Sequence, residues 1–247
     1  MRILFFTENL GAGGKERRML ELINQLKFKY NHDILIVLTE NKIQYKYVYE
    51  WDIKIEIVER SYFKKDTSIF FKFYRLCKKF KPDVIHTWGI MHTFYAIPSK
   101  LFGKSYLVSS MITNASLNIR KSIWSSLIFD LGFKCSDVNL SNSYAGIKAY
   151  KLNKAKVKVI YNGVRLERFD RNFDLNYVEK KFNIIEDIKV VMVASTSKNK
   201  FYDLFTELAK NFLLSNRKIA FIAVGGGDDF ERLSKRVKNE NISNLFF

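Results

Sequence analysis

The chain has 247 residues, of which 47% are hydrophobic and 15% aromatic, and this composition indicates a globular protein with one large or two modest packed domains. Its formal net charge of +17 favours an acidic partner, but no nucleic-acid-binding motif is present, so we expect no nucleic acid. The longest apolar runs are far shorter than the ~20 residues of a membrane span, and Glu8 comes too early for a signal peptide, so we expect a cytoplasmic protein.

Strand and helix patterns alternate along the first two thirds of the chain. Strands are predicted at 2–7, 32–40, 53–58, 83–88, 106–112, 136–141 and 156–161. Helices are predicted at 15–30, 66–80, 90–102, 118–133 and 143–151, with Pro82 ending the second helix. This alternation predicts a doubly wound parallel sheet with helices on both faces.

A second set of elements begins near residue 187. Strands are predicted at 188–195 and 218–227, helices at 202–215 and 228–240, and a last apolar run at 244–247. We therefore expect an N-terminal Rossmann-like domain at 1–166, a linker with a short helix at 167–186, and a partial second Rossmann-like domain at 187–247. So few elements would leave a sheet edge exposed, which is why we interpret the second domain as partial.

A glycine-rich loop joins the first strand to the first helix. Gly11, Gly13 and Gly14 would allow positive φ and let backbone N–H groups approach another surface closely. The helix that follows carries an apolar face, and its charged residues, including Arg18, are expected to point mostly outward. Because a helix amino terminus attracts anions, the loop is interpreted either as a phosphate or carboxylate site or as a structural tight turn.

Residues 42–81 combine eleven basic and five acidic residues with many aromatic side chains. Such a segment could lie on an anionic membrane surface. The alternative is a solvated, lysine-rich face of an ordinary globular domain.

Several motifs in sequence order resemble the GT-B glycosyltransferases of the large retaining family 4. The resemblance covers essentially the whole chain and is carried by RILFFTENLGAGGKERRMLEL, KPDVIHTWG, SDVNLSNS, KVIYNGVRLERF, MVASTSKNKFYDLFTELAKNF and FIAVGGGDDFERLSKRV. It implies a GT-B fold, with a Rossmann-like acceptor-side domain followed by a donor-side domain.

The resemblance also implies roles for residues of the first domain. Gly13 and Gly14 would approach the donor diphosphate or the acceptor, and Asn162 of the Asn-Gly-Val motif would bind substrate. His86 ends the fourth-strand motif and His92 follows it, so both are candidates for a catalytic position near the reacting sugar. Many relatives have a second histidine where this chain has Trp88, and which of the two histidines acts stays open.

In the second domain, relatives use an arginine and a lysine to neutralise the departing nucleotide diphosphate. Lys200 matches the lysine, Ser195 stands at the arginine position, and Phe201 replaces the glycine that follows the lysine; Lys198 could substitute for the arginine. The GGGDD stretch is either a ligand loop or a strand-to-helix turn capped by Asp228. The glutamate pair of the family, separated by seven residues, has no match, so we expect a truncated member with impaired activity.

The leading hypothesis is a hexosyl-type glycosyltransferase of polysaccharide or glycolipid assembly. Its donor would be a nucleotide sugar, its acceptor a glycan or lipid-linked hydroxyl group, and it would need neither a metal nor a cofactor. One alternative is a non-catalytic basic protein that binds a membrane or another partner, peripheral on the cytoplasmic membrane face. Another is a nicotinamide-dependent or epimerase-like Rossmann enzyme, which the glycine loop alone suggests.

Overall fold

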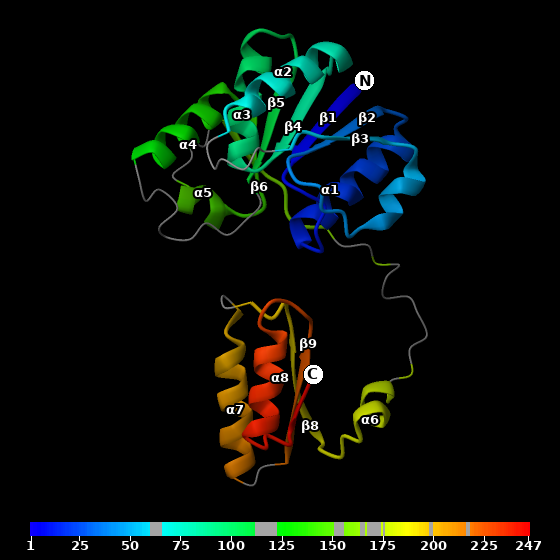
Figure 1. Ribbon diagram of the computed structural model, residues 1–247, viewed down its shortest axis with the longest axis vertical. Helices are drawn as coiled ribbons and strands as arrows, with labels where there is room; N and C mark the ends of the chain where they lie inside the picture. Colours follow the sequence, from blue (N-terminus) through cyan, green and yellow to red (C-terminus); the bar gives the residue numbers. More distant parts are fainter. Residues whose placement is uncertain are drawn as a thin grey trace. The chain divides into compact units, whose positions relative to one another are not determined.

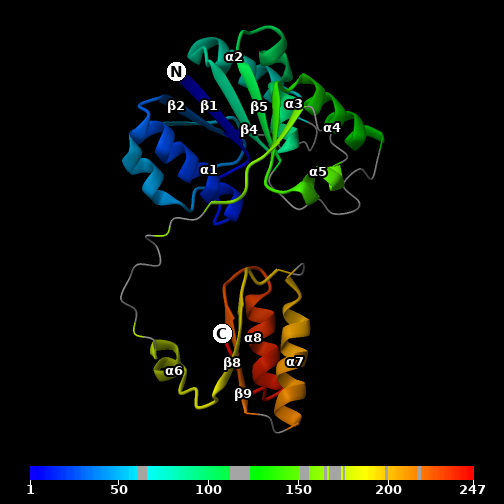
Figure 2. The same ribbon diagram turned by 180° about the vertical axis from the view of Figure 1, so that it is seen from behind.

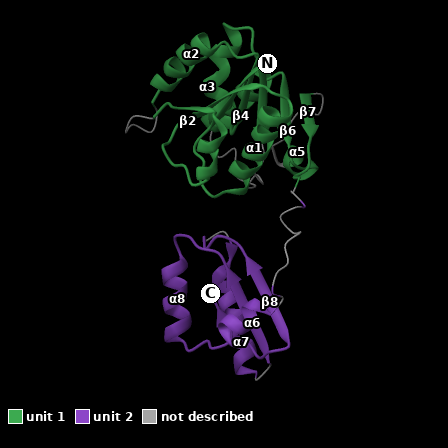
Figure 3. Cartoon of the chain, turned by 90° about the vertical axis from the view of Figure 1, so that its right-hand side faces the viewer, with its two compact units in different colours: residues 1–164 green, residues 165–247 purple. Residues whose placement is uncertain are grey.

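The computed structural model describes residues 1–59, 66–111, 123–150, 156–163, 166, 174, 176–197, 200–215 and 218–247 (Figure 1). The chain divides into two compact units, Met1–Val164 and Arg165–Phe247 (Figure 3). Each unit has its own sheet and its own core. The acceptor-side and donor-side roles, with the predicted bounds 1–166, 167–186 and 187–247, stay predictions.

The first unit contains a seven-stranded sheet in the order β3-β2-β1-β4-β5-β6-β7. Every neighbouring pair is parallel. The strands are β1 (Arg2–Thr7), β2 (Asp33–Leu38), β3 (Lys54–Ile57), β4 (Val84–Trp88), β5 (Tyr106–Met111), β6 (Val138–Ser141) and β7 (Val157–Val159). All seven lie where the sequence predicts strands. The chain adds strands outward from β1 to β3 on one side, and then from β4 to β7 on the other side of β1.

Helices cover both faces of this sheet. The helices are α1 (Gly14–Asn24), α2 (Ser68–Phe80), α3 (Ile90–Leu101), α4 (Ile123–Cys135) and α5 (Tyr144–Tyr150), with a π-helical segment at Gln25–Lys29 and a 3₁₀ helix at Lys46–Trp51. Alternate residues of β1 belong to opposite cores: Leu4 and Phe6 pack with α2 and α3, whereas Ile3 and Phe5 pack with α1. The doubly wound fold is therefore confirmed.

The turn from α2 into β4 aligns β4 with β1. Lys81 adopts a left-handed conformation (φ 51°) and its N–H donates to the carbonyl of Cys77 at 2.7 Å, after which Pro82 prevents further helix. The carboxylate of Asp83 then accepts a hydrogen bond from the backbone N–H of Arg2 at 2.7 Å. The predicted end of this helix at Pro82 is confirmed.

The basic, aromatic segment 42–81 does not form a single surface element. Phe73 is fully buried, Trp51 packs against the core beside α1, and Tyr49 and Phe71 are exposed. Residues 60–65, with Arg60, Tyr62, Phe63, Lys64 and Lys65, lie outside the described residues. In the described part of the chain, no helix is long and apolar enough to cross a membrane.

The second unit has a three-stranded parallel sheet in the order β10-β9-β8. Its elements are α6 (Tyr177–Phe182), β8 (Ile188–Val193), α7 (Tyr202–Leu214), β9 (Ile219–Val224), α8 (Phe230–Asn239) and β10 (Leu245–Phe246). Figure 2 shows α7 and α8 on one side of β8 and β9, where they bury Phe205, Phe221 and Leu233. Among the described residues, the other face is covered near Ile184 and Ile222, and β8 leaves Val191 and Val193 exposed.

Candidate functional site

His86 lies in β4, between β1 and β5 in the sheet. Its side chain is 6% exposed, its ring lies against Phe5 and Trp88, and its Nε2 is 2.6 Å from Oγ of Ser110 on β5. Burial lowers the pKa of His86 to about 3, because the charged imidazolium would lose its hydration. The imidazole is therefore neutral at physiological pH, with one nitrogen that donates a hydrogen bond and one that accepts.

A pocket of about 340 Å³ opens beside His86 at the carboxyl edge of the sheet, where open α/β sheets bind ligands. It is lined by Arg18, Glu21, Leu22, His86, Trp88, Ser110, Leu140, Ser141, Ile160, Tyr161 and Gly163. Asn162 is exposed between Tyr161 and Gly163, so the Asn-Gly-Val motif reaches the rim of the pocket that contains His86. The structure thus brings these two predicted site regions together.

Two N–H donors of this pocket are buried without a hydrogen-bond partner among the described residues, Nη1 of Arg18 and Nε1 of Trp88. Burial also lowers the pKa of Arg18, while nearby Glu21 acts in the opposite direction. The sequence predicts that the charged residues of α1 point mostly outward; Arg18 is half-buried and lines the pocket, because the first turns of α1 lie over the carboxyl edge of the sheet. Buried, unpaired donors are costly, and these two are placed to donate to acceptor oxygens in the pocket.

The glycine loop differs from the prediction in its backbone. Gly13 has φ −91°, and the described glycines with positive φ are Gly89, Gly225 and Gly227, so the expected positive φ in this loop is wrong. The N–H of Gly13 donates to Gly11, and the Gly13 carbonyl accepts from the hydroxyl of Tyr45 at 3.1 Å. Gly13 is the N-cap of α1 and Gly14 is its exposed first residue. Their predicted contact with substrate stays a prediction.

His92 occupies a different position from His86. It lies in the first turn of α3, 5% exposed, with its ring edge against Phe6 and its Nε2 3.3 Å from Oγ1 of Thr39. Among the described residues that line the His86 pocket, His92 is not included. The geometry favours His86 of the two predicted catalytic histidines.

In the second unit, Lys200 is exposed and its N–H donates to the carbonyl of Ser197. Lys198 lies outside the described residues. Phe201, at the position where relatives have glycine, is left-handed with φ 56°, so the backbone keeps a glycine-like conformation without the glycine. The N-cap of α8 is Asp229, one residue after the Asp228 of the capped-turn interpretation, and it makes no side-chain capping hydrogen bond.

Gly225 and Gly227 follow β9 and lie against the loop after β8. A Cβ on Gly225 would come 1.9 Å from the carbonyl oxygen of Ala194, and φ is +144° there, so only glycine fits. In the described part of the chain, no cluster of three His, Cys, Asp or Glu side chains could hold a metal ion. Independence from metals and cofactors stays a prediction.

Two Rossmann-like units, with a pocket at the carboxyl edge of the first unit's sheet, match the architecture of the GT-B fold. The sequence model of Glycosyltransferase Family 4 matches residues 12–168, and the chain belongs to this family. No curated protein matches the sequence.

Solved structures support the same fold. Anabaena HepE (Alr3699), in complex with UDP and glucose, is 16% identical with a TM-score of 0.79, and the match covers 100% of this chain and 69% of that chain. A glycosyltransferase from Rickettsia africae is 19% identical with a TM-score of 0.72, covering 100% and 67%. The lipopolysaccharide outer core galactosyltransferase WaaB is 18% identical with a TM-score of 0.64, covering 100% and 68%.

Proposed function

We propose that the protein transfers a hexosyl group from a nucleotide-sugar donor to a hydroxyl group of a glycan or lipid-linked acceptor, with retention at the anomeric carbon. The bond between the sugar and the nucleoside diphosphate breaks, a bond to the acceptor oxygen forms, and the acceptor proton leaves. Membership of Glycosyltransferase Family 4 supports this proposal, as do the structures of HepE with UDP and with UDP-glucose. Polysaccharide or glycolipid assembly is the proposed setting, in line with the lipopolysaccharide galactosyltransferase WaaB.

The pocket beside His86 is the single observation that carries the proposal. Neutral His86, hydrogen-bonded to Ser110, lies in one pocket with the unpaired donors of Arg18 and Trp88. Sugar hydroxyls and phosphate oxygens would accept from these donors, and the neutral imidazole would position a hydroxyl without opposing a developing positive charge on the sugar. In the second unit, exposed Lys200 is the candidate cation for the departing diphosphate.

The 247-residue chain is proposed to be an impaired transferase. No pair of glutamates with the family's context is present to accept hydrogen bonds from the donor's sugar and ribose hydroxyls. Each lost charged partner is worth about 1.5–3 kcal/mol, so the donor affinity should be lower by a hundredfold or more.

The test is a product assay with UDP- and GDP-sugars and glycan or lipid-linked acceptors, run on the 247-residue chain at high enzyme concentration. Slow transfer that His86→Asn abolishes, with His32→Asn unchanged as a matched control, is the expected result. Equal rates for the two variants would contradict the role of His86. Steady turnover with micromolar donor affinity would contradict the impairment.

Peripheral binding to an anionic membrane is proposed as the location of the protein. The net charge of +17 supports this, together with apolar side chains that α4 exposes, Ile123, Trp124 and Leu127. Sedimentation with vesicles tests it: binding to anionic vesicles that salt releases is expected, and equal binding to neutral vesicles would contradict it.

A further inference from the structure

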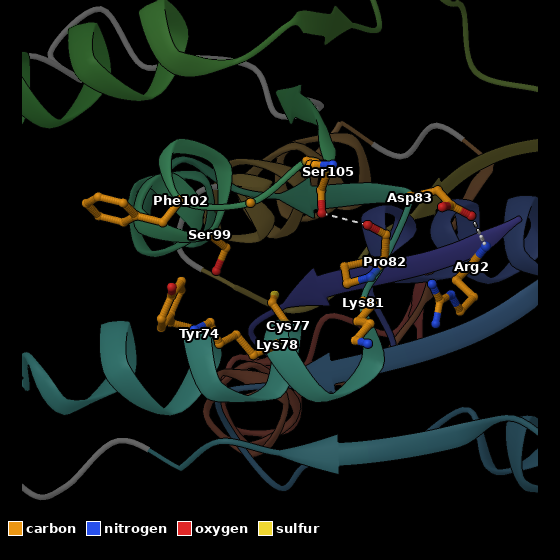
Figure 4. Close-up of a pocket in the computed structure, with 12 residues that line it drawn as sticks. Arg2, Tyr74, Cys77, Lys78, Lys81, Pro82, Asp83, Ser99, Phe102 and Ser105 are labelled. Carbon is orange, nitrogen blue, oxygen red and sulfur yellow. Dashed lines mark hydrogen bonds between the residues drawn. The ribbon is translucent and has the colours of Figure 1, made fainter.

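A second pocket, of about 510 Å³, lies at the amino edge of the sheet in the first unit. Arg2 at the start of β1 and Asp83 before β4 mark this edge, which the length of the strands separates from the His86 pocket at the carboxyl edge. Figure 4 shows Cys77 of α2 and Ser99 of α3 facing the same hollow. No residue of this pocket lines the pocket beside His86, so the proposed transfer reaction does not use it.

The rim of this pocket is strongly basic. Arg2, Lys78, Lys81 and Lys104 line it, and Asp83 is the one acidic residue among the described residues that do so. One oxygen of the Asp83 carboxylate already accepts the backbone N–H of Arg2. The carboxyl ends of α2 and α3 each add a partial negative charge of about half a unit, and the four full cations outweigh these charges and that of Asp83. The pocket therefore suits an anion.

A buried hydroxyl group at the wall of the pocket has no nitrogen or oxygen partner. Ser99 is 3% exposed, and its Oγ pairs with no nitrogen or oxygen atom among the described residues; its hydrogen-bonding neighbour is the thiol of Cys77. Burial raises the pKa of the neighbouring Cys77 to about 12, an effect that Ser99 opposes only in part. The thiol is therefore neutral and adds no negative charge to the site. Ser99 can donate to an oxygen that enters the pocket.

An apolar hollow of about 440 Å³ adjoins the basic pocket, and both are lined by Tyr74 and Phe102. The rest of its lining is Thr67, Phe70, Phe71 and Pro98. Phe71 is 58% exposed and Phe102 is 75% exposed. The guanidinium of Arg75 stacks on the Phe71 ring at 4.2 Å, and the exposed parts of both rings can cover an apolar chain. Cations around one hollow and aromatic rings around the next match a ligand with an anionic head and an apolar tail.

We propose that these adjoining hollows bind an amphiphilic phosphate ester, with the phosphate between Lys78, Lys81 and Ser99 and the apolar chain along Tyr74 and Phe102. Three N–H or O–H donors with two full charges satisfy a phosphate group, and the tail gains burial against the rings. The inference does not rest on the transfer of a sugar. A membrane phospholipid and a soluble phosphate ester share this head group, and the tail distinguishes them.

The chain offers two unique dipeptides for a site-specific test. Gly103, which lines the basic pocket, is the glycine of the chain's one Phe-Gly dipeptide. Gly163, which lines the His86 pocket, is the glycine of its one Asn-Gly dipeptide. Labelling glycine nitrogen with ¹⁵N and the carbonyl carbon of phenylalanine or asparagine with ¹³C therefore gives each amide as a single NMR signal. Dihexanoyl phosphatidylglycerol, kept monomeric, should shift the Gly103 signal saturably and leave Gly163 in place.

Two comparisons make the test decisive. The double variant Lys78→Gln/Lys81→Asn, which keeps a residue tolerant of the left-handed conformation at 81, should weaken binding about tenfold or more. Lys42→Gln/Lys46→Gln removes the same charge after β2, at the carboxyl edge, and should bind as the unaltered chain does. Glycerol 3-phosphate should bind at least tenfold more weakly than the lipid. No shift at Gly103, equal affinity for the two ligands, or equal effects of the two double variants would overturn the proposal.

Discussion

Nε2 of His86 lies 2.6 Å from Oγ of Ser110, and the two side chains are only 6% and 3% exposed. They come from adjacent parallel strands, β4 and β5, in which His86 pairs with Val108 and Trp88 pairs with Ser110. The contact is therefore a property of the sheet and not of one loop. It fixes the imidazole ring at the wall of the pocket and satisfies one of its two nitrogens.

Ser110→Ala should destabilise the first unit by about 1–3 kcal/mol, because it leaves a buried ring nitrogen without its partner. Urea unfolding followed by tryptophan fluorescence measures this, since Trp51, Trp88 and Trp124 all belong to the first unit. Ser68→Ala, at the exposed start of α2, is the control and should change the free energy of unfolding by less than about 0.5 kcal/mol. Equal losses of unfolding free energy in the two variants would show that the His86–Ser110 hydrogen bond does not stabilise the first unit.

The low pKa of His86 predicts how stability depends on pH. The unfolded chain binds a proton near pH 6.5 while the folded chain stays neutral down to a pKa of about 3. The unfolded state thus binds more protons in this window, so stability falls as the pH drops below about 6.5 and the loss is complete near pH 3. Between pH 6.5 and 5 the loss should approach about 2 kcal/mol, at 1.36 kcal/mol per pH unit.

Urea unfolding of the unaltered chain and of His86→Asn at pH 7.5 and 5 measures this contribution. The variant should lose less stability than the unaltered chain by about 2 kcal/mol over this range. The range stays above the ordinary pKa values of Asp and Glu, so the surface carboxylates with lowered pKa, such as that of Asp203, contribute little. Equal pH dependence of the two proteins would contradict a neutral, buried His86.

Phe201→Gly should stabilise the second unit by about 1 kcal/mol. Phe201 has φ 56° and is 71% exposed, so glycine relieves the left-handed strain and loses little packing. Hydrogen exchange at the amides of β9 reports the opening of this unit. Leu208→Gly, inside α7 and also exposed, is the contrasting control and should cost about 1 kcal/mol. If Phe201→Gly does not slow the exchange of these amides, the left-handed backbone at Phe201 is not strained.

The sequence predicts the elements of both units because their signals are local. A short continuous apolar run marks β1, and Pro82 after a helical run marks the end of α2. The order of the strands is not local, and it is what places Ser110 beside His86. Sequence alone therefore indicates that His86 lies in a site but not which side chain holds it.

Arg18 shows the same limit on a helix. It lies three residues before Glu21 and four before Leu22, so these three side chains share one side of α1, and all three line the pocket. The apolar stripe of α1 was the stronger signal, and it assigned Arg18 to solvent. The turn after β1 brings that side of the helix over the edge of the sheet. The residue pattern of the helix alone does not predict this placement.

Arg18→Met should raise the stability of the unliganded protein and lower its affinity for the sugar-bearing ligand. Nη1 of Arg18 is buried without a partner in the described part of the chain, and a buried, unsatisfied donor costs about 1–3 kcal/mol, which the apolar side chain removes. Lys15→Met is the control: Lys15 also lies on α1, pairs with Glu16 at 3.0 Å and is not among the described residues lining the pocket. Urea unfolding gives the stability and calorimetry with UDP-glucose and acceptor glycans gives the affinity. If Arg18→Met destabilises the fold, or if both variants bind equally, the guanidinium of Arg18 is not a ligand-binding group of this pocket.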